Sequence, residues 1–397
     1  MVKKKSVTIF ADDLDSRSKE QFRICYEKDF VVAASLMPDA HAGYVAPIGS
    51  VLVSRGFVVP AWVGYDIGCG VTAVRLIGEN LLRKVKENSK EIYREVKATI
   101  PMGLGKLHSV SDVHKENLLK FNEIFEKLLA SPHDSEITDW IKRKAPSNIG
   151  TLGEGNHFIE IGEADDNKLD EVWLIIHSGS RNVGHKVATK YMIKASGKIE
   201  GFEDTFPLDV NSDLGKEYLA ILDFGLEFAL INRLDLAMSV KDCIETVLNE
   251  PIDFEVWTNK NHNHAVPEIE EDGGVVYIHR KGATPAKKGE RGVIPGNMRD
   301  GCYLVEGLGN KNFLESSSHG AGRKMSRAKA KKLISMDDFI KSMDGIVGTI
   351  KEGTLDESPD AYKDIFDVMS KQKESVRVIR TIKPLINWKG DSKKKFK

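Results

Sequence analysis

The sequence predicts a single large α+β domain that spans residues 1–397. Strand-type and helix-type stretches alternate without the regular strand–helix–strand rhythm that produces a parallel, doubly wound sheet. Neither an internal repeat nor a low-complexity linker divides the chain. Hydrophobic residues make up 41% of the chain and charged residues 29%, which is the composition of a folded globular protein.

Hydrophobic periodicity gives the order of the elements. The chain up to about residue 35 reads as a short strand, a charged helix and a second strand. Runs rich in β-branched residues over 49–54 and 71–76 predict two further strands. Apolar residues at helical spacing predict helices over residues 79–100, 112–130, 213–249 and, in several pieces, 334–371.

Composition and charge narrow the class of protein. No apolar run approaches the roughly 20 residues that a membrane helix needs, and the basic start is followed too soon by charged residues to be a secretory signal. The four cysteines are scattered, which predicts no disulfide framework and makes the cytoplasm the expected compartment. The chain has 58 basic and 59 acidic residues, so its net charge is close to zero. Nucleic-acid binding would therefore need a local basic patch, such as Lys281–Arg291, Arg323–Lys332 or Lys389–Lys397.

The stretch Trp62–Val71, WVGYDIGCGV, carries a carboxylate and a thiol three residues apart, Asp66 and Cys69. The glycines around them let the backbone turn sharply and approach a ligand closely. We expect both side chains on one side of a tight turn, where they can bind one ion or two neighbouring ions. The alternative is a structural turn with a buried, inert thiol.

Histidines in glycine- or serine-rich settings recur along the chain, at His157, His177, His262 and His319. Singly, each is more often a hydrogen-bonded residue at the end of a strand. Together with the carboxylate and the thiol, they predict a catalytic centre for Zn²⁺, Mn²⁺ or Fe²⁺, because Mg²⁺ and Ca²⁺ prefer oxygen ligands alone. The remaining candidates lack such settings and are expected at the surface: His108, His114 and His133.

Two segments have the character of phosphate sites. The loop GTLGEGNHFIE, Gly150–Glu160, can present backbone N–H groups and the amide of Asn156 to phosphate oxygens, although it is not a Walker A loop. The buried strand VWLII runs directly into His177 and then Arg181. This order predicts an imidazole ligand beside a guanidinium that holds a phosphate.

These motifs, in this order, resemble the RtcB family of RNA-splicing ligases from about residue 37 to Gly390. The stretches that carry the resemblance are DAHAGY with PIG (39–49), GYDIGCGV (64–71), GNHFIE (155–160), HSGSR (177–181), HRKGAT (279–284) and HGAGR (319–323). The resemblance implies the family's own α+β fold, with mixed sheets around a central metal cleft.

The resemblance also implies a GTP- and Mn²⁺-dependent ligase that joins an RNA 2′,3′-cyclic phosphate or 3′-phosphate to an RNA 5′-hydroxyl. The family's guanylylated histidine falls on His319. Its two-ion site falls on Cys69 as the bridge, with Asp66 and His157 around one ion and His177 and His262 around the other.

The family's GTP pocket falls on residues from several motifs. They are Asn156, His157, Phe158, Ile159, Glu160, His262, Asn263, Pro295, Gly296, Asn297, Met298, Cys302, His319, Gly320, Ala321, Gly322 and Lys389.

The chain departs from the family pattern at Gly68, Glu154 and Cys302, where Asn, Gly and Ser are usual, and it is shorter than typical members. It is therefore expected to be a divergent paralogue. The resemblance leaves open whether it acts in tRNA splicing or RNA repair, and whether it needs an activating partner such as archease. The alternatives are a metal-dependent phosphoesterase that opens cyclic phosphates without ligating, and a non-catalytic RNA- or nucleotide-binding protein.

Overall fold

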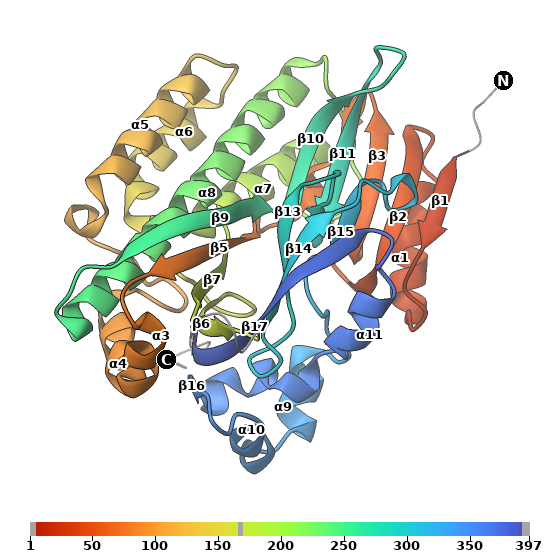
Figure 1. The fold of residues 1–397 in the computed structure, drawn as a ribbon. Helices are drawn as coiled ribbons and strands as arrows, with labels where there is room; N and C mark the ends of the chain where they lie inside the picture. Colours follow the sequence, from red (N-terminus) through yellow and green to blue (C-terminus); the bar gives the residue numbers. More distant parts are fainter. Residues whose placement is uncertain (1–4, 166–169, 391–397) are drawn as a thin grey trace.

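Two β-sheets share one continuous stretch of chain. Strand β9 (Asp253–Asn261) of the larger sheet is followed, after His262 alone, by strand β10 (Asn263–Ile269) of the smaller sheet. The computed structural model describes residues 5–165 and 170–390, and helices and mixed sheets alternate along them (Figure 1). The α+β prediction is confirmed, and a single domain over residues 1–397 stays a prediction.

The larger sheet has the order β13-β14-β17-β6-β7-β5-β9, and every neighbouring pair in this path is antiparallel. The short strand β16 (Val347–Gly348) pairs with β17 in parallel. The other strands of this sheet are β13 (Arg291–Pro295), β14 (Cys302–Gly307), β17 (Val376–Lys389), β6 (Phe158–Ala164), β7 (Val172–Ser178) and β5 (Gly70–Ile77).

The smaller sheet has the order β1-β2-β3-β11-β10, with β1 parallel to β2 and the other pairs antiparallel. Its strands besides β10 are β1 (Ser6–Ile9), β2 (Val31–His41), β3 (Ile48–Arg55) and β11 (Val275–Lys281). Two further pairs of strands are β4 (Phe57–Val58) with β8 (Leu208–Asp209), and β12 (Ala283–Pro285) with β15 (Ser316–Ser318).

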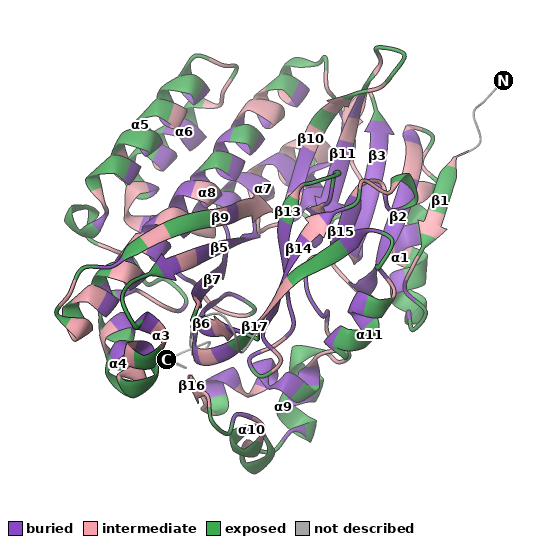
Figure 2. Ribbon diagram, in the orientation of Figure 1, coloured by how far each residue is buried: buried purple, intermediate pink, exposed green. Residues whose placement is uncertain are grey.

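The long helix α8 (Asp213–Leu248) packs against strands β5, β7 and β9 and against helices α4, α5 and α7 (Figure 1). Its apolar residues belong to two hydrophobic clusters, so this helix joins the cores on either side of it. Figure 2 shows strands such as β3 and β7 almost wholly buried, whereas the outer faces of α4 and α5 are exposed.

The remaining helices cover the sheets and the loops between them. The α-helices are α1 (Ser16–Tyr26), α2 (Pro60–Val63), α3 (Leu81–Glu87), α4 (Ser89–Thr99), α5 (Lys115–Leu129), α6 (Ser135–Lys144), α7 (Arg181–Ser196), α9 (Arg327–Leu333), α10 (Met336–Ser342) and α11 (Ile365–Ser370). The 3₁₀ helices are η1 (Val110–Asp112), η2 (Pro146–Asn148), η3 (Lys311–Phe313), η4 (Glu352–Glu357) and η5 (Pro359–Ala361). Within the described ranges, no helix is both long and apolar enough to cross a membrane.

Most predicted elements are confirmed, with one helix divided. The predicted helix 79–100 is two helices, α3 and α4, because the side chain and the backbone N–H of Asn88 both donate to the carbonyl of Lys84 and end α3 there. The strands predicted at 49–54 and 71–76 are β3 and β5, which lie in different sheets. Residues 391–397 of the predicted basic tail lie outside the described residues.

His108, His114 and His133, which were expected at the surface, are each partly exposed and partly buried. His114 lies between two carboxylates of α8: its Nδ1 is 2.9 Å from Asp235 and its Nε2 is 2.9 Å from Asp242. The hydrogen bond to Asp235 is the main reason that the pKa of His114 is raised to about 9. The imidazolium therefore ties the start of α5 to α8.

We expect His114→Gln to lose stability in a pH-dependent way. Because the pKa of His114 is 6.5 when unfolded and about 9 when folded, its contribution is complete below pH 6.5 and is lost as the pH rises through 9. Urea denaturation should show the difference from wild type shrinking over this window by up to about 1.4 kcal/mol per pH unit. His133→Gln, which removes a contact to a backbone carbonyl, is the control. An equal difference at pH 6 and pH 9.5 would contradict this account.

Candidate active site

Strand order brings four candidate ligands to one edge of the larger sheet. Antiparallel neighbours alternate in direction, so the starts of β5 and β6 lie beside the ends of β7 and β9. The residues at these positions are Cys69, His157, His177 and His262. Side chains far apart in the sequence therefore converge without any long loop to place them.

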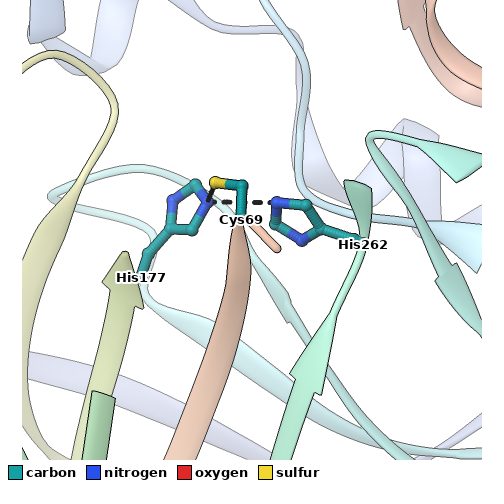
Figure 3. Close-up of side chains that lie close together, drawn as sticks. All are labelled: Cys69, His177 and His262. Carbon is teal, nitrogen blue, oxygen red and sulfur yellow. Dashed lines mark hydrogen bonds between the residues drawn. The ribbon is translucent and has the colours of Figure 1, made fainter. Parts of the chain in front are cut away.

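Cys69, His177 and His262 form the first ligand set, and all three are buried. The Cys69 sulfur is 3.2 Å from Nε2 of His177, and this nitrogen is 3.3 Å from Nε2 of His262. Figure 3 shows the two imidazoles pointing at each other from β7 and from the β9–β10 junction, with the thiol beside them. Three donor atoms thus face one small space.

Asp66, Cys69 and His157 form the second ligand set, so the thiol belongs to both. Nε2 of His157 is 2.8 Å from the Asp66 carboxylate and 3.4 Å from the Cys69 sulfur. In each set the donor atoms lie within 4.8 Å of one another. The turn from Asp66 to Cys69 closes through a backbone hydrogen bond of 3.1 Å, and both side chains converge on His157 from this turn.

Backbone carbonyls fix the orientation of two of the imidazoles. Nδ1 of His157 donates to the carbonyl of Leu152 (3.2 Å), and Nδ1 of His177 donates to that of Asn156 (3.1 Å). The bond on Nδ1 of His177 leaves the lone pair on Nε2, the nitrogen that faces the thiol. The bond on Nδ1 of His157 turns Nε2 of that ring toward the thiol and the Asp66 carboxylate. Burial also holds the pKa of His177 and of His262 well below the ordinary value, so both imidazoles are neutral, as metal ligands must be.

The donor set fits a transition metal. Burial, followed by the nearby Asp66, raises the pKa of the Cys69 thiol well above its ordinary value, so a cation would be needed to stabilise the thiolate. Burial alone would raise the pKa of Asp66 as well. The charge of His157 and its hydrogen bond to the carboxylate nevertheless hold the pKa of Asp66 below its usual range. A thiolate, a carboxylate and imidazoles suit Mn²⁺, Co²⁺, Zn²⁺ or Fe²⁺ better than Mg²⁺ or Ca²⁺.

The buried Arg233 of α8 lies beneath these ligands. Its Nη1 donates to the carbonyls of Gly68 and Ser178, each at 2.9 Å. Its Nη2 donates to the side chain of Asn261 at 2.7 Å, and its Nε to that of Asn259 at 2.8 Å. One guanidinium therefore connects the residue before Cys69, the residue after His177 and the residue before His262.

Two glycines allow the close approach of the elements around the site. Gly68 has φ of +71°, and a Cβ there would lie 2.7 Å from the Cβ of Ala229 on α8. This contact gives a physical reason for glycine where the family usually has Asn. A Cβ on Gly179 would lie 2.2 Å from the Asp66 carboxylate, so only glycine lets this side chain sit against the loop after β7.

His319 is held by a carboxylate on the other side of His262. Its Nδ1 donates to Oδ2 of Asp39 at 2.7 Å, and its backbone N–H reaches the same oxygen at 3.2 Å. Asp39 is fully buried, and the ring centroids of His262 and His319 are 4.9 Å apart. Because Asp39 accepts a hydrogen bond from Nδ1–H, the lone pair of a neutral His319 is on Nε2. Asp39 belongs to the DAHAGY motif and lies in β2, but the sequence alone indicated no role for it.

A cavity of about 820 Å³ connects the ligand sets with His319. Most residues predicted for the nucleotide pocket line it: Asn156, Phe158, Glu160, His262, Asn263, Pro295, Gly296, Asn297, Met298, Cys302, His319, Gly320, Ala321, Gly322 and Lys389. Two do not. His157 lies among the ligands, and the side chain of Ile159 faces the opposite side of β6, fully buried in the hydrophobic core. A side-chain contact from Ile159 to a nucleotide is excluded by this placement.

Glu160 is a buried acid on the cavity wall. It accepts hydrogen bonds from the Cys302 thiol (3.3 Å) and from the amide of Asn387 (3.0 Å). Burial is the main reason that its pKa is raised to about 7. Cys302, one of the departures from the family pattern, thus supplies a donor at the position where a serine hydroxyl would donate.

Glu357 of η4 holds several cations at the far end of the cavity, a role that no sequence signal indicated. Its carboxylate accepts from Lys389 at 2.7 Å, from Arg323 at 3.3 Å and from Arg327. The hydroxyl of Tyr362 also donates to it, at 2.5 Å. Burial would raise the pKa of Glu357, but the charges of Lys389 and the two arginines hold it at about 2.

Arg181 begins α7 with φ of +59° and lies behind the second ligand set. Its guanidinium donates to the hydroxyl of Thr151 at 3.3 Å and is also 3.3 Å from Nδ1 of His157. Burial lowers the pKa of Arg181, while the charges of Asp66, Cys69 and Glu154 raise it. Glu154, another departure from the family, therefore offsets part of the arginine's charge, and the predicted phosphate contact of Arg181 stays a prediction.

Two other histidines of the motifs are structural. Nε2 of His264 is 3.2 Å from Nη1 of Arg280. Nε2 of His279 accepts a hydrogen bond from the backbone N–H of Val59 at 2.9 Å, so this nitrogen is not available to bind a metal ion. Neither belongs to the ligand sets found among the described residues.

The fold and the site define an α+β protein with two ligand sets that share a thiol, beside a cavity with a carboxylate-held histidine. The model of the family described as tRNA-splicing ligase RtcB matches residues 23–390. The RNA-splicing ligase RtcB of Escherichia coli (strain K12) is 32% identical over 378 residues, covering 90% of each chain. The tRNA-splicing ligase RtcB of Nanoarchaeum equitans is 31% identical, covering 89% of this chain and 87% of its own. The chain belongs to the RtcB family.

We expect Glu357→Gln to lower the free energy of unfolding by about 3–5 kcal/mol, because it leaves buried cations without their counter-charge. Denaturant unfolding at pH 7 measures this loss. Glu352→Gln, on the exposed side of the same 3₁₀ helix, is the matched control and should change little. Adding Lys389→Met to Glu357→Gln should cost less than the sum of the two single changes. A Glu357→Gln protein within 1 kcal/mol of wild type, roughly the worth of a surface pair, would contradict this expectation.

Proposed function

We propose that this protein is a GTP- and Mn²⁺-dependent RNA ligase that joins a 2′,3′-cyclic phosphate or 3′-phosphate end to a 5′-hydroxyl end through a guanylylated His319. The family membership and the names of its relatives support the ligase. One observation carries the chemical proposal. A histidine with a free Nε2 lone pair lies 4.9 Å, centroid to centroid, from His262 of the first ligand set.

Asp39 prepares His319 for nucleophilic attack. By accepting a hydrogen bond from Nδ1–H, the carboxylate fixes the neutral tautomer and stabilises the positive charge that the ring gains as Nε2 forms a bond. We propose that Nε2 attacks the α-phosphorus of GTP, that the bond from this phosphorus to the bridging oxygen breaks, and that pyrophosphate leaves. Water first opens a 2′,3′-cyclic phosphate by breaking the bond from phosphorus to the 2′-oxygen, which leaves a 2′-hydroxyl and a 3′-phosphate. The RNA 3′-phosphate then takes the guanylyl group from His319, whose imidazole is released, and the 5′-hydroxyl displaces GMP.

The metal ligands in this proposal are Asp66, Cys69 and His157 for one Mn²⁺ ion, and Cys69, His177 and His262 for the other. When bound, the ions withdraw electron density from phosphate oxygens and neutralise the charge of the leaving group. Arg233 keeps the backbone of both sets in place from below. Neutral His177 and His262 need no deprotonation before they bind an ion.

We assign the guanine of GTP to the end of the cavity where Glu160 and Lys389 lie. Both side chains are buried and line the cavity, and the Lys389 ammonium lies 5.6 Å from the centroid of the Phe158 ring. A planar base fits beside a ring, a carboxyl and an ammonium because its edge offers both donors and acceptors. Arg181 and Arg323 remain our candidates for RNA phosphates.

A phosphoesterase that opens cyclic phosphates without ligating is the second candidate. It would use the same ligand sets but would have no use for a histidine oriented by Asp39. The arrangement of Asp39 and His319 therefore favours the ligase.

We further propose that the protein acts in tRNA splicing or in RNA repair, that archease activates it, and that it is located in the cytoplasm. The four cysteines, all free, fit the reducing compartment.

Guanylylation is the direct test. We expect protein incubated with Mn²⁺ and GTP labelled at the α-phosphate to carry an acid-labile label on denaturing gels, as a phosphoramidate does. His319→Ala and Cys69→Ala should carry none, and Asp39→Asn should label at least tenfold more slowly, within the usual range for a lost hydrogen bond to a catalytic group. A folded, metal-loaded wild type that stays unlabelled, with and without archease, would leave the phosphoesterase as the better reading.

Metal stoichiometry is expected to follow the shared thiol. Wild type should bind two Mn²⁺ per chain by electron paramagnetic resonance titration. His157→Ala and His262→Ala should each lose one ion, and Cys69→Ala should lose both, because only Cys69 belongs to both sets. His264→Ala, which removes an imidazole that contacts Arg280, should retain two. Loss of a single ion from Cys69→Ala would show that the thiol is not the bridge.

A further inference from the structure

Three aromatic rings form a contiguous group beside the cavity, and two of them line it. They belong to Tyr44 in the loop after β2, Tyr65 in the turn before Asp66, and His185 on α7. The rings of Tyr65 and His185 stack with centroids 4.8 Å apart and planes 17° apart. The ring of Tyr44 stands edge-on to Tyr65 at 5.8 Å. We call these three residues the aromatic platform.

Tyr44 is 70% exposed, yet its loop is held in place. The amide of Gln21 donates to the carbonyls of Gly43 and Tyr44, each at 2.8 Å, and its oxygen accepts from the N–H of Gly43 at 3.1 Å. Arg17 donates to the same Gly43 carbonyl at 3.2 Å. A large exposed ring on a loop fixed by four hydrogen bonds is oriented before any partner arrives, which lowers the entropy cost of binding.

Tyr65 is held at both ends of its side chain. Its hydroxyl donates to Glu203, and its ring rests on His185, so little rotational freedom remains. The next residue along the chain is Asp66, a member of the second ligand set. The position of the platform is therefore tied to the position of the ligands.

The platform opens onto the same cavity as the ligand sets. Tyr44 and Tyr65 line this cavity together with Asp66 and Cys69. The side chains of Arg17 and Lys281 line it as well, so cationic groups lie near the rings. Flat rings beside cations, open to solvent and next to a phosphate-handling site, match the requirements of an unpaired nucleobase and its backbone.

We propose that the aromatic platform stacks the unpaired nucleobase at the RNA end that is being joined. This inference rests on the proposed ligase function and deepens it by assigning an RNA contact. The base of GTP is a different occupant, because its pocket lies at the Glu160 and Lys389 end of the cavity. Stacking on a tyrosine face tolerates every base, so the platform favours single-stranded ends without selecting a sequence.

The test uses RNA that carries 2-aminopurine at its 3′-phosphate end or at its 5′-hydroxyl end. Binding to wild type should quench the probe at one of these ends, which identifies the strand that the platform holds. Tyr44→Ala and Tyr65→Ala should abolish this quenching and weaken RNA binding roughly tenfold each, within the range that loss of one stacked base produces. Tyr44→Phe and Tyr65→Phe should retain both.

Phe366→Ala removes an aromatic ring that is 69% exposed but lies outside the cavity, and it should bind RNA as wild type does. An abasic nucleotide at the quenched end should weaken binding to wild type by a similar factor, so the proposal stays testable if an alanine variant misfolds. Equal quenching by wild type and both alanine variants, or no quenching at either end, would overturn the platform. Labelling of wild type by GTP in the absence of RNA is measured separately. A labelled protein that does not quench the probe contradicts the aromatic platform alone, whereas an unlabelled protein contradicts the ligase proposal.

Discussion

The geometry of the active-site edge depends on one guanidinium that has no access to water. Arg233 binds two backbone carbonyls and two asparagine side chains at the ends of β5, β7 and β9. Burial lowers its pKa to about 10, so it remains charged at neutral pH. An apolar side chain of the same size would leave these acceptors buried without partners, at a cost of about 1–3 kcal/mol each. The charge also opposes the negative charge of Asp66 and of a Cys69 thiolate.

The same principle, a buried charge that orients its neighbours, recurs at the other two sides of the cavity. Asp39 orients His319, and Glu357 gathers Lys389, Arg323 and Arg327. Each carboxylate comes from a different part of the chain, and none belongs to a ligand set. The three sides of the cavity are therefore organised separately: the larger sheet carries the two candidate ligand sets, β2 carries the carboxylate that orients His319, and η4 carries the carboxylate that holds Lys389, the last residue of β17.

The grouping into two ligand sets was implied by the family resemblance. The single ligands Asp66, Cys69, His157 and His177 could be predicted from sequence because each lies close to a glycine in a turn or at a strand end, where local pattern and chemistry coincide. Asp39 and Glu357 could not, because their partners His319 and Lys389 are 280 and 32 residues away, and no local pattern records such contacts. Ile159 was included with its motif although strand alternation turns it into the core. The split at Asn88 depends on one side-chain hydrogen bond.

The place of β17 in the larger sheet has a consequence for synthesis on the ribosome. This strand lies between β14 and β6 and is translated after every other described strand of the sheet. Until it emerges, β13 and β14 cannot join β6, β7, β5 and β9, and two hydrogen-bonding edges stay open to other chains. The larger sheet therefore closes only after translation of Lys389. The nascent chain therefore exposes unpaired strand edges from the synthesis of β6 until the synthesis of β17, and such edges are prone to aggregation.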